Sequence, residues 1–190
     1  MKRKVIMILG VSFIIMMAAL FIFYLIKEDS SRWQVALGGI LVSALPMLLL
    51  LTKKNPFNMP LIIGYYAFIF CTLVLGSIAS FYLKLKWWDS TLHLYKGIFV
   101  GLIAIALYKF WLPEQAQKFS SRWILFLFVF SLPLTATVLW EIYEFLGDLF
   151  ITHTMQRGGN KDTMIDVLAG TAGGLLIAVY ATLWKEKILN

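Results

Sequence analysis

The sequence is poor in cysteine and in charged residues. Of its 190 residues, only Cys71 is a cysteine, and 14% are charged. One thiol cannot build a disulfide framework or a thiolate metal cluster, so both are excluded. A soluble domain has about a quarter of its residues charged, so this chain does not carry a water-facing surface of the usual kind. It also lacks a long polar linker and a convincing internal repeat, which favours a single domain.

Apolar residues make up most of the chain instead. They account for 61% of it, and the mean hydropathy is +0.82. A membrane-spanning helix needs about 20 mainly apolar residues, and six stretches reach that length. We therefore predict an all-α polytopic membrane protein, with six transmembrane helices in one bundle forming a single domain over 1–190. The predicted spans are 5–26, 33–51, 59–83, 91–112, 123–146 and 163–184.

Tryptophan and basic residues support these spans and orient them. Six of the seven tryptophans lie at or beside a predicted span end, where an amphipathic indole prefers the headgroup layer. The net charge is +7, which in a membrane protein indicates loops facing anionic lipid, so we expect no nucleic-acid partner. The side that holds both termini carries ten Lys and Arg, against six in the other loops. This bias predicts cytoplasmic termini in a bacterial plasma membrane.

The acidic residues are the most informative feature of the chain. Six of the ten lie near the ends of spans four to six, on the same predicted outer side. In span five, three acids share one helical face at i, i+3 and i+7, and the other two spans carry similar short polar stripes. We therefore expect the three stripes to meet at one depth. Their members are Asp89, His93 and Lys96 in span four, Glu141, Glu144 and Asp148 in span five, and Asp162 and Asp166 in span six.

Several carboxylates close to hydrocarbon must be neutralised, because each is costly to bury and they repel one another. Protonation, a bound cation or basic neighbours would each do this. The basic candidates are Lys96, Arg157 and Lys161.

A divalent metal such as zinc is the most specific of these possibilities. We predict that His93 binds the metal together with two or three carboxylates, and that the remaining carboxylates act as general base. The predicted metal ligands are His93, Glu141, Glu144, Asp148 and Asp166, and the predicted catalytic residues are Glu141, Glu144 and Asp166. Simpler interpretations remain open: a structural ion-pair network, a His93 that only forms hydrogen bonds, and helix N-capping by Asp89 and Asp162.

The basic residues suggest a second ligand at the same end of the bundle. Lys96, Arg157 and Lys161 lie near the expected N-termini of spans four and six, whose positive dipole ends attract anions. Together they would hold a lipid phosphate or pyrophosphate, with or without a metal. The predicted function is therefore binding of a cation or lipid headgroup, with membrane lipids as partners and a possible metal-dependent hydrolase or transferase activity on an envelope lipid. An ion- or proton-coupled transporter and a non-catalytic accessory protein are the alternatives.

Small residues indicate how span six packs. Gly170, Gly173 and Gly174 continue from Asp166 along roughly one face, and small residues let membrane helices approach closely. We expect span six to pack tightly against span five or four. Pro46 and Pro133 lie within predicted spans and are expected to bend them.

The second half of the chain resembles a known family. Asp89-Ser-Thr-Leu-His93, Trp140-Glu141-Ile-Tyr-Glu144 and Asp162-Thr-Met-Ile-Asp166 before a glycine-rich helix are similar to the uncharacterised YjdF-type bacterial inner-membrane proteins, and more distantly to the VanZ-like family. The resemblance implies a polytopic membrane protein, with one VanZ-like branch associated with low-level glycopeptide resistance. It marks the quoted acids and His93 as site residues. Ser90, Glu144 and Gly170 depart from the VanZ-like pattern, which favours the YjdF-type assignment.

Overall fold

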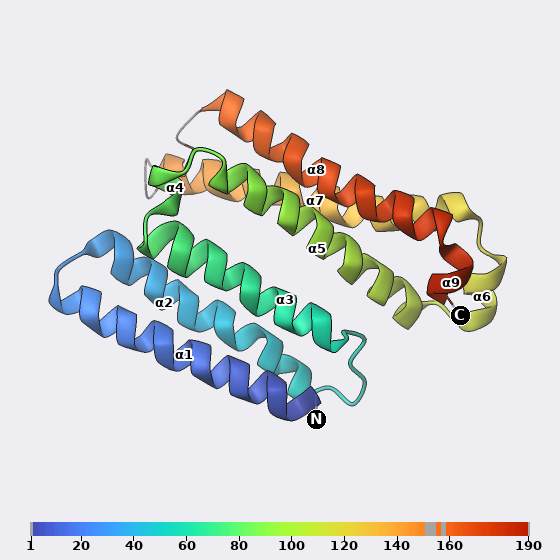
Figure 1. Cartoon of the computed structure of the whole chain (residues 1–190), viewed down its shortest axis with the longest axis horizontal. Coiled ribbons are helices and arrows are strands. Elements are labelled where there is room, and N and C mark those ends of the chain that lie inside the picture. The colour runs from blue at the N-terminus through green and yellow to red at the C-terminus, as the bar shows by residue number, and fades with distance from the viewer. Residues whose placement is uncertain (1, 151–154, 157–158, 190) are drawn as a thin grey trace. The chain divides into compact units, whose positions relative to one another are not determined.

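A computed structural model describes residues 2–150, 155–156 and 159–189 (Figure 1). Within these residues all regular secondary structure is helical and there is no strand, which confirms the predicted fold class. It forms two compact units, Met1–Trp88 and Asp89–Asn190. Each unit is described by itself.

The first unit is built on three apolar helical segments. In chain order its helices are α1 (Lys2–Ile26), α2 (Ser30–Ala44), the 3₁₀ helix η1 (Leu45–Leu50), α3 (Met59–Ile69), the π-helix η2 (Phe70–Ile78) and the short α4 (Phe81–Lys84). Helices α1, α2 and α3 lie side by side (Figure 1). Their buried core includes Ile6, Ile62, Tyr66 and Ile69.

Local sequence explains where these helices change. Asp29 caps α2, because its carboxylate accepts a hydrogen bond from the Arg32 backbone N–H at 3.0 Å. Pro46 cannot donate a backbone hydrogen bond, and the chain tightens there from α2 into η1. The third predicted span is shorter than expected: its helix ends at Ile78, and Ser80 adopts a left-handed conformation with φ of 64°.

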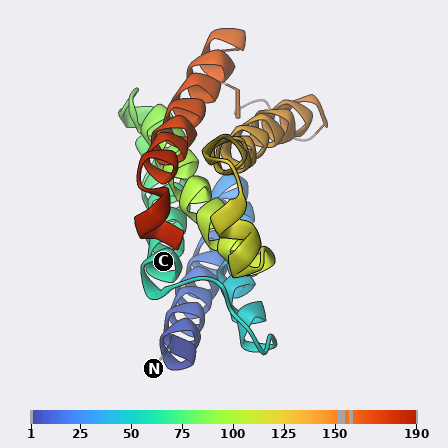
Figure 2. The same ribbon diagram turned by 90° about the vertical axis from the view of Figure 1, so that its right-hand side faces the viewer.

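The second unit contains three long helices and two short ones. They are α5 (Trp88–Trp111), α6 (Glu114–Phe119), α7 (Arg122–Phe150), α8 (Asn160–Leu183) and α9 (Lys185–Leu189). Helix α8 packs along α7, and α9 lies against α6 (Figure 1 and Figure 2). The buried Lys185 supports this end of the unit, because its ammonium donates to the carbonyl oxygens of Lys118 and Ser120.

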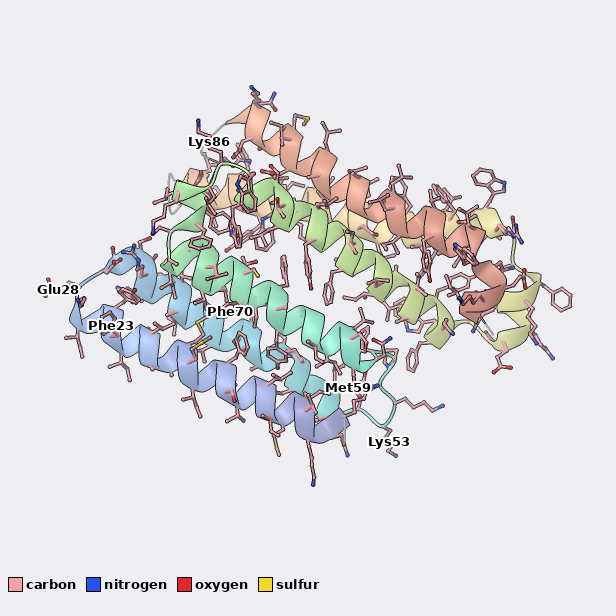
Figure 3. All side chains as sticks on the ribbon, in the orientation of Figure 1. Phe23, Glu28, Lys53, Met59, Phe70 and Lys86 are labelled. Carbon is pink, nitrogen blue, oxygen red and sulfur yellow. The ribbon has the colours of Figure 1, made fainter. Side chains whose placement is uncertain are left out.

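Six helical segments are long and apolar enough to cross a membrane. They are Lys2–Ile26, Ser30–Leu50, Met59–Ile78, Trp88–Trp111, Arg122–Phe150 and Asn160–Leu183. Only 17% to 33% of the most apolar window of each is buried. Many large apolar side chains therefore point away from the helices, as Phe23 does in Figure 3 with 49% of its surface exposed. Lipid is the solvent that fits such a surface, which supports the predicted six-span membrane protein.

Glycines bring α8 close to both α5 and α7. A Cβ on Gly97 of α5 would collide with the carbonyl oxygen of Gly170 in α8. On the α7 side, a Cβ on Gly174 would lie 2.6 Å from the Cβ of Pro133, and one on Gly170 would overlap the Thr137 hydroxyl. The predicted tight packing of the sixth span is confirmed, and it involves both neighbouring helices.

Candidate metal centre

The glycine contacts place polar side chains from three helices beside one another. His93 lies four residues before Gly97 in α5, and Asp166 lies four residues before Gly170 in α8. In α7, Glu141 follows Thr137 by the same interval. Residues four apart share a helical face and are separated by about 6 Å along the axis. A polar layer therefore lies one turn from the glycine layer, and close backbone packing holds it together.

Asp89, His93 and Asp166 converge in this layer. Each offers one ligand atom, and these atoms lie within 4.8 Å of one another. His93 and Asp166 are 3% and 2% exposed, and Asp89 is half-buried. A cation at the centre of such a group needs only small side-chain shifts to reach metal–ligand distances of about 2.0–2.2 Å. One imidazole nitrogen and two carboxylates are suitable ligands for zinc and other divalent metals.

The two nitrogens of His93 face different groups. Nε2 lies 3.6 Å from Oδ1 of Asp89, while Nδ1 lies 3.5 Å from Oε1 of Glu141 and 3.4 Å from the Lys96 ammonium. The ring also forms a hydrogen bond with the backbone of Asp166. A histidine that binds metal through one nitrogen commonly donates its other N–H to a carboxylate. Glu141 would accept that proton once the Lys96 ammonium, which can donate but not accept, turned away from Nδ1.

Two buried carboxylate oxygens lack a hydrogen-bond partner among the residues that the structure describes. They are Oε1 of Glu141, a residue 6% exposed, and Oδ1 of Asp166. Thr163 hydrogen-bonds the Glu141 carboxylate and Ser90 that of Asp166, but these contacts leave the two oxygens without a donor. An unsatisfied buried carboxylate oxygen is costly, so both oxygens favour an added proton or cation.

Lys96 supplies positive charge beside these acids. It is 8% exposed, and its ammonium lies 4.8 Å from the centre of the Trp140 ring, in a cation–π contact. The Trp140 indole N–H donates to Oε1 of Glu144 at 2.8 Å. Among the residues that the structure describes, the Lys96 ammonium faces four carboxylates, those of Asp89, Glu141, Glu144 and Asp166. The excess of negative charge is what a divalent cation would offset.

Two predicted ligands of span five have other contacts. Asp148 accepts hydrogen bonds from the backbone N–H groups of Met155 at 3.0 Å and Gln156 at 2.8 Å. Glu144 is half-buried and binds Trp140. Neither belongs to the convergent Asp89, His93 and Asp166 group, and nor does the third predicted span-five ligand, Glu141; the group includes Asp89, which was not predicted as a ligand.

The simpler interpretation of Asp89 and Asp162 as helix N-caps does not hold in the structure. Helix α5 begins at Trp88, so Asp89 lies inside its first turn. Helix α8 has Gly159 as its N-cap, which places Asp162 in the first turn as well. Both helices start earlier than the apolar pattern indicates. The change frees Asp89 from capping and directs it toward His93.

The predicted basic residues separate in the structure. Lys96 lies in the polar layer, while Lys161 is exposed in the first turn of α8. Arg157 lies outside the described residues.

Four contributors were not identified from the sequence: Ser90, Thr137, Trp140 and Thr163. Their contacts lie between helices or depend on the side-chain rotamer. Helical periodicity alone therefore does not predict these contacts. Trp140 offered one clue, because it is the tryptophan that lies away from the predicted span ends.

Comparison with known proteins places the chain in a family. Residues 9–187 match a family model described as "Predicted membrane protein (DUF2238)". The chain belongs to the DUF2238 family. An uncharacterized protein of Thermotoga maritima is 32% identical over 105 residues, which cover 55% of this chain and 53% of that relative. The match thus spans about half the length of this Thermotoga maritima relative. No solved structure matches the DUF2238 chain described here.

Proposed function

We propose that this DUF2238 protein is a membrane metalloenzyme that hydrolyses or transfers part of an envelope lipid. Asp89, His93 and Asp166 bind the metal in this proposal. The observation that carries it is that their ligand atoms lie within 4.8 Å of one another, while Oδ1 of the buried Asp166 has no donor within the described residues. A pure ion-pair network fits less well, because within the described residues a single ammonium, that of Lys96, faces four carboxylates.

The ligand set favours a catalytic over a purely structural metal. Structural zinc sites use four protein ligands, mainly Cys and His, whereas catalytic sites use three and leave a position for water or substrate. Here one histidine and two aspartates supply three ligands. Zinc is the first candidate, and the oxygen-rich set also suits other divalent metals.

Glu141 is the proposed general base. Its Oε1 is buried, lies 3.5 Å from Nδ1 of His93 and has no hydrogen-bond donor among the described residues. A bound zinc ion would lower the pKa of its water to about 7, so that a carboxylate can accept the proton. In ester hydrolysis, Glu141 would accept one proton from the attacking water and give it to the oxygen that leaves as the ester bond breaks.

The position of the site along its helices favours a lipid headgroup as substrate. Asp89 and His93 lie in the first two turns of α5, and Asp166 lies in the second turn of α8. Helix ends of this kind lie near the headgroup layer, whereas coupled transporters bind their substrates near the bilayer midplane. We place this end on the extracytoplasmic side, with both termini in the cytoplasm of a bacterial plasma membrane. The likeness to YjdF-type and VanZ-like proteins is consistent with an envelope role.

Lipid turnover by the purified protein tests this function. The protein is incubated in detergent with a bacterial lipid extract, and mass spectrometry follows loss of substrates and gain of products. We expect turnover that a chelator abolishes and added zinc restores. Glu141→Gln should remove turnover while the protein still takes up metal, and Lys118→Gln, an exposed residue of α6, should leave turnover unchanged. Metal-loaded protein without turnover, but with ion-dependent counterflow in liposomes, would instead favour the transporter.

A further inference from the structure

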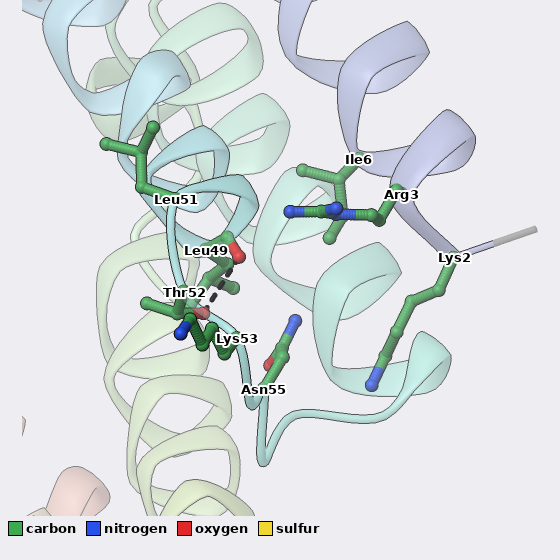
Figure 4. Close-up of a pocket in the computed structure, with 8 residues that line it drawn as sticks. All are labelled: Lys2, Arg3, Ile6, Leu49, Leu51, Thr52, Lys53 and Asn55. Atoms are coloured by element: carbon green, nitrogen blue, oxygen red, sulfur yellow. Dashed lines mark hydrogen bonds between the residues drawn. The ribbon is translucent and has the colours of Figure 1, made fainter.

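A pocket in the first unit lies at the end that carries the N-terminus of α1. It has a volume of about 310 Å³ and is bounded by the first turns of α1, the end of η1 and the following loop (Figure 4). Its polar lining consists of Lys2, Arg3, Thr52, Lys53 and Asn55. Three of these five side chains are cationic, and the first turn of α1 adds the partial positive charge of a helix N-terminus.

This end of the unit has no acidic residue to balance the cations. The only acids between residues 1 and 88 are Glu28 and Asp29, beyond the opposite end of α1. Figure 3 shows Glu28 and Lys53 at opposite ends of the helices. Asp29 is paired with Arg32 at 2.6 Å. The positive charge around the pocket is therefore uncompensated by any carboxylate of this unit.

The polar groups that face the pocket are hydrogen-bond donors. Oδ1 of Asn55 accepts from the Phe57 backbone N–H at 2.9 Å, so its amide NH₂ is left to donate (Figure 4). Arg3 donates one N–H to the Leu50 carbonyl oxygen, which positions a guanidinium with further donors. Lys2 and Lys53 form no hydrogen bond or ion pair in the part of the chain that the structure describes. A lining of donors selects an anion with several acceptor oxygens, which is the chemistry of phosphate.

The surroundings of the pocket favour phosphate attached to a lipid. The pocket lies where the first membrane span begins and the second ends, next to the apolar side chains of Ile6, Leu49 and Leu51. Leu51 is 82% exposed. A lipid headgroup at the membrane boundary would place its phosphate among the cations and its glycerol and acyl carbons against these side chains.

We propose that this pocket binds a phosphate group, supplied by an anionic membrane lipid. The inference is independent of the metal centre, because it uses only residues of the first unit. A soluble phosphate ester has the same recognition chemistry, so the experiment must separate these two sources.

Native mass spectrometry of the full chain in detergent, titrated with phosphatidylglycerol, tests the proposal. Lys2→Gln/Lys53→Gln removes two pocket cations that make no internal hydrogen bond in the described structure. Lys27→Gln/Lys86→Gln removes the same charge outside the pocket and is the matched control. We expect about tenfold weaker phosphatidylglycerol binding in the pocket variant and wild-type binding in the control. Equal binding by wild type and pocket variant, or an equal loss in the control, would overturn the proposal.

A competition arm identifies the source of the phosphate. Inorganic phosphate in millimolar amounts should not displace phosphatidylglycerol from the wild-type protein if the ligand is a lipid. Displacement that is lost in Lys2→Gln/Lys53→Gln would retain the phosphate site but overturn the lipid as its ligand. Arg3→Gln is a second pocket variant, and it should also weaken phosphatidylglycerol binding. Because Arg3 donates to the Leu50 carbonyl oxygen, the thermal unfolding temperature of this variant shows whether that contact is also needed for folding.

Discussion

Nδ1 of His93 lies 3.5 Å from Oε1 of Glu141, a residue of another helix. The opposite nitrogen of the ring faces Asp89 at 3.6 Å. If Nε2 binds a metal, Nδ1 must carry the remaining proton, and the Glu141 carboxylate is the group placed to accept it. In the proposed metal-bound state Glu141 would hold the tautomer and the orientation of His93, with the Lys96 ammonium turned from Nδ1 toward a carboxylate.

Glu141→Gln should weaken metal binding without abolishing it. Loss of a carboxylate behind a metal-binding histidine typically lowers affinity about 10- to 100-fold. Competition with a fluorescent chelator measures this change. Glu144→Gln is the matched control, because the same substitution one turn away affects a side chain bound to Trp140. Equal affinities of the two variants would contradict the role given to Glu141.

Gly97→Ala should destabilise the second unit. The added methyl would collide with the carbonyl oxygen of Gly170, a backbone atom that cannot move without separating α5 from α8. Overpacking of this kind costs about 1–3 kcal/mol. Thermal unfolding in detergent, followed by tryptophan fluorescence, measures the effect. Gly38→Ala in α2 is the control, since nothing lies within 4 Å of its Cβ, and it should unfold at or above the wild-type temperature.

The ion pair at the start of α2 gives a prediction about pH. Hydrogen bonds from Arg32 hold the pKa of Asp29 below the ordinary value of 3.8 for an aspartate. A depressed folded-state pKa contributes stability above the unfolded value, and this is lost as the pH falls through the folded value. Asn can still cap the helix, so Asp29→Asn should unfold at a slightly lower temperature than wild type near pH 7. The difference should disappear well below pH 3.8, and a difference that grows on acidification would contradict this account.

The proposed orientation predicts which loops an impermeant reagent can reach. In a Cys71→Ser background, Lys161→Cys should react with an impermeant maleimide in intact cells. Lys53→Cys should react only after lysis, because the positive-inside bias places its loop in the cytoplasm. The reverse pattern would place the metal centre on the cytoplasmic side.

The spans and the acidic stripes were predictable because both follow from periodicity. Six apolar stretches gave six helical segments, and the spacing of Asp89 from His93 indicated a shared face in α5. The glycines after Asp166 indicated close packing of α8, which brings the stripes together. These features depend on residue type and on distance along the chain, and both can be seen without a structure.

Contacts that form where the chain turns back, and contacts that depend on the packing of individual atoms, were not predictable. Asp148 continues the helical stripe of Glu141, yet it binds backbone N–H groups of the segment that follows α7. The first turn of α5 takes in Asp89 because the helix begins at Trp88, three residues before the expected start. The pocket proposed to bind phosphate is lined by Arg3 of α1 and by Asn55 of a later loop. No local sequence pattern relates these two residues.

Metal content of the purified protein tests the central claim most directly. Elemental analysis by mass spectrometry compares wild type, Asp166→Asn and Asp148→Asn, each exposed to zinc in detergent and then washed. Asp148→Asn is the matched control, because it removes an acid outside the convergent group. The account predicts about one metal ion per chain in wild type and Asp148→Asn, and loss of the metal in Asp166→Asn. Wild-type protein without metal, or Asp166→Asn with as much as wild type, would contradict it.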